Sequence, residues 1–130
     1  MKKTRKLLSV LLALAIVLSM SISAFAASSS AGKYGTISGS LIATGASTFR
    51  SKTSVLQNPD SARLYVTYDV YTDTDSRIGG TTSVSGTGAT SFIDNYSSPT
   101  IYGETIDHCF GCHEVRSASG SYATYTFTYV

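Results

Sequence analysis

Hydrophobic and polar residues alternate with a period of two along most of the chain after residue 33. The clearest case is residues 63–72, RLYVTYDVYT, where one face carries Leu64, Val66, Tyr68 and Val70 and the other carries Tyr65, Thr67, Asp69 and Tyr71. This alternation is typical of a β-strand with one face in a core and one in water. It predicts further strands over residues 37–43, 49–55, 81–86, 101–108 and 122–130.

Turn-forming residues separate these segments, among them Asn58-Pro59-Asp60, the run from Asp73 to Gly80, the sequence GTGATS, and Ser98-Pro99. Short strands with a turn roughly every 8–12 residues are typical of all-β domains. We therefore expect residues 34–130 to form a single domain, a small antiparallel β-sandwich of about seven strands. A small β-barrel is the alternative.

The first 26 residues have a different pattern. A cationic start (MKKTRK), an apolar run and the small-x-small sequence Ala24-Phe25-Ala26 are the three parts of a secretory signal peptide, in a form typical of bacteria. We expect residues 1–26 to be removed and the mature protein to be secreted and extracellular. It would keep no membrane anchor, because the apolar run is shorter than the ~20 residues of a spanning helix. Residues 27–33 are small and polar and predict a flexible N-terminal arm.

Removal of the leader changes the charge of the protein. The whole chain has ten Lys and Arg against eight Asp and Glu, but four basic residues lie in the leader, so the mature net charge is −2. A mildly acidic chain with scattered basic residues offers no patch for nucleic acid or an anionic membrane.

Both cysteines and both histidines of the chain lie in one hexapeptide, HCFGCH, at residues 108–113. We expect Phe110-Gly111 to be the turn of a β-hairpin that pairs Cys109 with Cys112 and His108 with His113. In an exported protein two neighbouring thiols favour oxidation, so we predict a disulfide between Cys109 and Cys112.

Two cofactor interpretations of this hexapeptide are alternatives. CFGCH has the spacing at which c-type haem is attached, but no methionine follows the leader to serve as the second axial ligand. Zinc could use His108, Cys109, Cys112 and His113, but adjacent strand residues point to opposite faces, so only two of these side chains would converge. We therefore expect neither a cofactor nor a metal.

Signals for catalysis are weak. The chain has no Gly-x-Ser-x-Gly elbow, and GTGATS lacks the lysine of a phosphate-binding loop. Asp73 and Asp75 resemble the start of a calcium loop, but Arg77 occupies the next alternate position. We therefore expect a protein that is not an enzyme.

Two non-enzymatic functions fit these observations. In the first, the protein is a recognition module, and Tyr65 and Tyr71 form an exposed aromatic platform for a cell-surface glycan or protein. The other interpretation of these tyrosines is that both faces of their strand are buried. The alternative function is that of a bacteriocin-like antagonist of neighbouring cells, which fits the predicted export, small size and all-β pattern.

Overall fold

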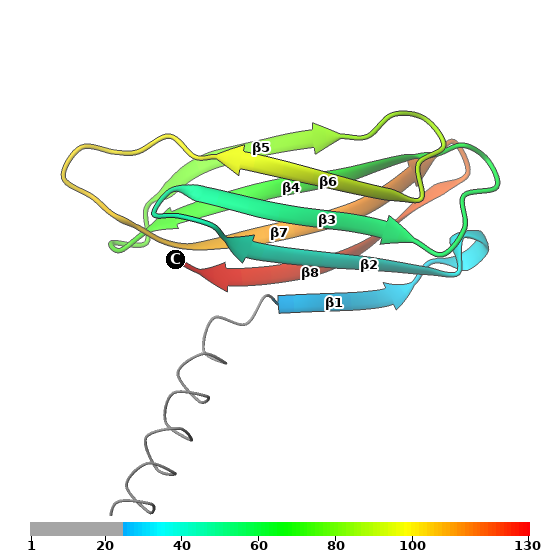
Figure 1. Cartoon of the computed structure of the whole chain (residues 1–130), viewed down its shortest axis with the longest axis horizontal. Coiled ribbons are helices and arrows are strands. Elements are labelled where there is room, and N and C mark those ends of the chain that lie inside the picture. Colours follow the sequence, from blue (N-terminus) through cyan, green and yellow to red (C-terminus); the bar gives the residue numbers. More distant parts are fainter. Residues whose placement is uncertain (1–24) are drawn as a thin grey trace, which may run out of the picture.

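The computed structural model describes residues 25–130, and the part of the predicted leader before Phe25 lies outside them. The described chain forms eight strands in two antiparallel sheets of four, which face each other as a sandwich (Figure 1). The predicted all-β sandwich is therefore confirmed. The barrel alternative is wrong, because the eight strands form two separate sheets.

Sheet A has the order β1 (Phe25–Ser30), β2 (Thr36–Ala43), β3 (Thr48–Val55) and β6 (Ser91–Ser97). Sheet B has the order β5 (Arg77–Val84), β4 (Arg63–Thr72), β7 (Ile106–Ser117) and β8 (Gly120–Tyr129). A single 3-10 turn, η1 (Gly32–Tyr34), joins β1 to β2, and β1 packs beside β8 of the other sheet (Figure 1). The connections after β3, β5 and β6 each cross from one sheet to the other.

The alternation in β4 determines how sheet B meets the core. Leu64, Val66, Tyr68 and Val70 are fully buried, as their spacing predicts. They pack against residues of sheet A and η1 that are buried to the same degree, namely Tyr34, Ile37, Leu41 and Phe49. The alternate residues of β4, beginning with Arg63 and Tyr65, therefore lie on the outer face of sheet B.

The N-terminal residues differ from the expected flexible arm. Ala27 pairs with Gly39 and Ser29 pairs with Ile37, so this segment belongs to β1, one of the two edge strands of sheet A. The side chains of Ala31 and Tyr34 are fully buried. Backbone pairing, which needs no apolar side chain, accounts for a strand in a segment of mostly small residues.

Two other segments also differ from expectation. Residues 98–105 are a loop, so the strand expected over 101–108 begins only at Ile106. Residues 91–97, which follow the turn-like sequence GTGATS and were not among the expected strands, form β6 at one edge of sheet A. Within residues 25–130 we find no helix with the length and apolarity to cross a membrane.

Candidate binding surface

The hexapeptide HCFGCH runs through the middle of β7 and makes no turn. Cys109 pairs with Val70 of β4 and Thr128 of β8, and Cys112 pairs with Thr67 and Tyr125 of the same two strands. The predicted hairpin is therefore wrong. Gly111 has another reason to be glycine, since a Cβ there would press against Thr126 of β8 and Leu41 of sheet A.

The predicted disulfide is also wrong, because the two cysteines lie on opposite faces of sheet B. Cys109 is buried inside the sandwich, Cys112 is half-buried on the outer face, and both are free thiols. Three residues of extended strand span about 10 Å, which exceeds the Cα separation of a disulfide. Burial raises the pKa of Cys109 to about 12 and that of Cys112 to about 11, with the charge of Glu114 contributing to the second shift.

The four residues considered as metal ligands are divided in the same way. His108 and Cys112 are on the outer face, whereas Cys109 and His113 are on the inner face, so they do not surround one ion. The expected pairing of His108 with His113 is wrong for the same reason. Among residues 25–130 no three His, Cys, Asp or Glu side chains gather in a metal-binding arrangement.

His113 connects the two sheets inside the core. Its Nδ1 lies 2.8 Å from Oγ1 of Thr53 in sheet A, and its Nε2 lies 2.7 Å from Oγ1 of Thr126 in sheet B. A neutral imidazole has one donor and one acceptor nitrogen, and each hydroxyl can complement either. Complete burial lowers the pKa of His113 to about 4, so the ring is neutral in the fold at neutral pH. Both nitrogens are satisfied internally, which makes this histidine a structural residue.

The outer face of sheet B carries a group of aromatic side chains that we call the aromatic face: Tyr71, His108, Phe110, Tyr125, Phe127 and Tyr129. Tyr71 stacks on His108 with ring centroids 5.1 Å apart, and Phe110 lies 4.9 Å from Phe127. Three of the rings remain open to solvent, with exposed fractions of 45% for Phe110, 70% for Tyr125 and 68% for Tyr129.

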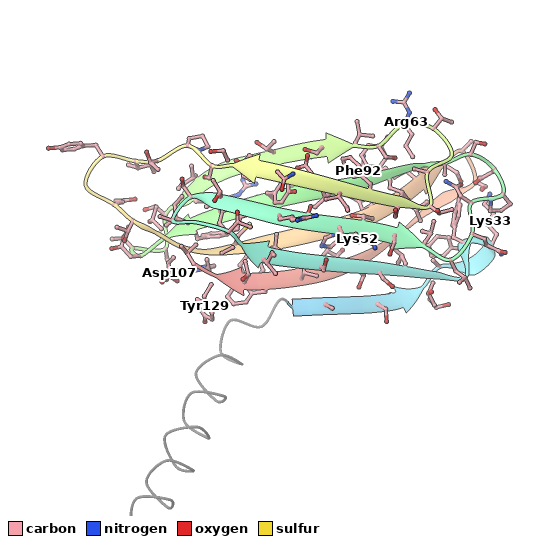
Figure 2. All side chains as sticks on the ribbon, viewed as in Figure 1. Lys33, Lys52, Arg63, Phe92, Asp107 and Tyr129 are labelled. Atoms are coloured by element: carbon pink, nitrogen blue, oxygen red, sulfur yellow. The ribbon has the colours of Figure 1, made fainter. Side chains whose placement is uncertain are left out.

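Strand register produces this grouping. Tyr71, His108 and Tyr129 are directly opposite one another on β4, β7 and β8. The next outward-facing row brings Phe110 beside Phe127. Charged groups border the rings, because Asp107 accepts a hydrogen bond from His108 Nδ1 (2.7 Å) and Asp69 pairs with Arg77. Figure 2 places Asp107 and Tyr129 at one end of the sandwich.

The two tyrosines predicted to form a platform share the outer face of sheet B but are not together. Tyr65 and Tyr71 are six residues apart on β4, which corresponds to about 20 Å. The guanidinium of Arg116 lies 4.2 Å from the ring centroid of Tyr65, whereas Tyr71 belongs to the aromatic face. The structure thus adds residues of β7 and β8 that the prediction omitted. Alternation of Tyr125, Phe127 and Tyr129 was the signal in the sequence that could have found those of β8.

The outer face of sheet A has a different character. Ser28, Ser38, Ser54 and Ser91 form one row across its four strands. Arg50 and Lys52 are exposed on the same face. This polar surface is usual for the solvated side of an antiparallel sheet, and the aromatic face departs from that rule.

Comparisons of the chain with protein-family models, with curated proteins and with solved structures found no match.

Proposed function

We propose that this protein is an exported, non-enzymatic binding module whose aromatic face contacts a glycan on a cell surface. The observation that carries the proposal is the contrast between the two outer faces: one is mostly polar, and the other carries five rings in mutual contact, with Tyr125 next to Phe127 on the same face of β8. A contiguous aromatic patch in contact with water favours an interaction site, because covering it releases ordered solvent.

The composition of the aromatic face favours a glycan over a purely apolar partner. A sugar ring has a side of C–H groups that packs on aromatic rings, and hydroxyls at its rim that need hydrogen-bond partners. The exposed rings of Tyr125 and Tyr129 carry hydroxyls of their own, and the carboxylates of Asp69 and Asp107 border the patch. This combination of ring faces and polar groups suits the two sides of a saccharide.

The test measures binding of the purified protein to immobilised cell-wall polysaccharide. Tyr125→Ala and Tyr129→Ala remove exposed rings, and we expect each to weaken binding about tenfold, since an aromatic contact contributes about 1 kcal/mol or slightly more. Tyr102→Ala is the matched control, because Tyr102 is fully exposed and lies in the loop before β7. Thermal unfolding of all three variants checks that the fold is retained.

Three outcomes would contradict the proposal. If Tyr125→Ala and Tyr129→Ala bind the polysaccharide as tightly as the parent protein, the aromatic face is not the binding surface. Concentration-dependent dimerisation that both variants abolish would assign the face to a second copy of the chain. Growth inhibition of related cells without surface binding would favour the bacteriocin-like alternative.

A further inference from the structure

A polar groove lies at the end of sheet B remote from Tyr129. It has a volume of about 440 Å³ and is formed by the segment before β4, the loop between β5 and β6, and the turn between β7 and β8. Its lining includes two arginines, an aromatic ring and several hydroxyls, contributed by Arg63, Tyr65, Arg116, Ser61, Ser117 and Ser119. Figure 2 shows Arg63 and Lys33 at this end, opposite the end that holds Asp107 and Tyr129.

The two arginines are placed against each other by strand register. Arg63 of β4 is directly opposite Arg116 of β7. Like charges in directly opposed positions of a ladder destabilise a sheet, so folding alone gives no reason for this pair. Arg116 is compensated by Glu114, to which it donates hydrogen bonds of 2.8 and 3.0 Å. Within residues 25–130 Arg63 has no ion pair, and Figure 2 shows its side chain extending away from the sandwich.

The acidic residue of the groove does not compensate Arg63. Asp60 forms an ion pair of 2.6 Å with Lys33 and accepts a hydrogen bond of 2.9 Å from the hydroxyl of Tyr34. The hydrogen bond from Lys33 lowers the pKa of Asp60, so this carboxylate is ionised. Its charge is already paired with that of Lys33. The guanidinium of Arg63 is left as the excess positive charge of the groove.

Asn58 holds the loops of the groove in place. Its Nδ2 donates hydrogen bonds of 2.8 Å to the carbonyls of Ala62, in the loop between β3 and β4, and of Ala89, in the loop between β5 and β6. Its Oδ1 accepts a hydrogen bond of 2.9 Å from the backbone N–H of Ala62. The backbone next to Arg63 is therefore held in place by hydrogen bonds. A binding group whose backbone is already ordered loses less conformational entropy when its ligand binds.

We propose that this arginine groove binds an anionic group, a phosphate or carboxylate carried by a glycan, with Arg63 as the principal contact and Arg116 and Tyr65 beside it. The guanidinium fork matches the paired oxygens of either group. The glycan part of this statement rests on the proposed function. Arg63 and Tyr71 are eight positions apart on β4, which corresponds to about 26 Å along the same outer face. A linear anionic polysaccharide could therefore contact both the groove and the aromatic face.

The experiment compares the binding of three polymers: a glycerol phosphate polymer, a uronic acid polymer and a neutral glucan. We expect Arg63→Gln to weaken binding of whichever anionic polymer the parent protein prefers about tenfold. Arg63→Lys, which keeps the charge but not the fork, should recover part of this loss. Neutral glucan binding should not change. Arg50→Gln is the matched control, because Arg50 is exposed on the outer face of sheet A. Preference for the first or second polymer identifies phosphate or carboxylate as the ligand group.

The stability of the variant separates a binding role from a structural one. Arg63→Gln removes the repulsion from Arg116, so its melting temperature should equal or exceed that of the parent. A clear fall in melting temperature would assign Arg63 to the fold and overturn the proposal. An equal loss of binding in Arg63→Gln and Arg50→Gln would also overturn it, by showing attraction to net charge alone.

A last measurement tests the groove even if no polymer binds. Titration with inorganic phosphate, followed by the Nε NMR signals of the arginines, should shift Arg63 and Arg116 and leave Arg50 unchanged. That result without polymer binding would reject the glycan function and retain the anion site. Absence of any selective shift would reject the anion site, whatever the polymers do.

Discussion

Acidification should destabilise this protein through His113. The pKa of this histidine is 6.5 in an ordinary environment and about 4 in the fold, because burial disfavours its charged form. Above pH 6.5 both the folded and the unfolded chain hold a neutral ring, so stability does not depend on this group. Between pH 6.5 and 4 the unfolded chain takes up a proton that the folded chain does not, and stability falls as the pH falls.

The size of the effect follows from the difference in pKa. A pKa difference of one unit corresponds to 1.36 kcal/mol. Lowering the pH from neutral to 4 should therefore reduce the free energy of unfolding by about 3 kcal/mol. This is a large part of the stability of an ordinary small domain, which is about 5–15 kcal/mol. No charged group offsets the loss, because the ring is held by the hydroxyls of Thr53 and Thr126.

Urea unfolding followed by tyrosine fluorescence between pH 7.5 and 5 measures this slope above the range in which carboxylates titrate. His113→Gln should be less stable at pH 7.5, because its amide fits the two hydroxyls imperfectly, and its stability should hardly change with pH. Asn95→Ala, altered on the exposed face of β6 where no titratable group is removed, should keep the slope of the parent. The same slope in His113→Gln and in the parent would refute the reasoning.

Three further predictions concern the fold. Gly39→Ala should lower the free energy of unfolding, measured in urea, by about 1–3 kcal/mol, because the new Cβ would overlap the His113 ring. Gly86→Ala is the control and should lose less, because a Cβ there meets no atom within 4 Å. Reducing agent should leave the melting temperature unchanged, since both thiols are free, and a clear fall on reduction would restore the disulfide. Asn58→Ala should lose about 1–3 kcal/mol of stability, because it leaves three part-buried loop groups without their partners. Asn95→Ala on the exposed face of β6 should be near neutral, and equal losses in the two variants would contradict this.

The extent to which sequence predicts this fold depends on the strand. In β4 every second residue from Leu64 to Val70 is apolar or aromatic, so alternation alone identifies the strand and its buried face. In β1 the side chains past Phe25 are small, and pairing with β2 depends on backbone groups that leave no apolar pattern. In β7 the glycine at position 111 resembles a turn residue, but the neighbouring sheet and Thr126 require it to be small.

The candidate surface shows a similar division. Alternation places Tyr65 and Tyr71 on the outer face, which the structure confirms. Alternation does not determine the pairing register between neighbouring strands. If β7 were shifted by one residue against β4 and β8, the side chains of His108 and Phe110 would point into the core. The pairing of Tyr71 with His108 and Tyr129 is therefore a property of the assembled sheet.

The position of β1 has a consequence for the order of events in biogenesis. The predicted processing site follows Ala26, and in the fold Phe25 and Ala26 are paired with Leu41 and Ser40 of β2. A peptidase that cuts there needs this segment as a separate extended chain, because its backbone groups cannot pair with β2 and with an enzyme at once. If the predicted leader is removed at this site, its processing competes with the docking of β1 on β2, and cleavage has to precede completion of sheet A.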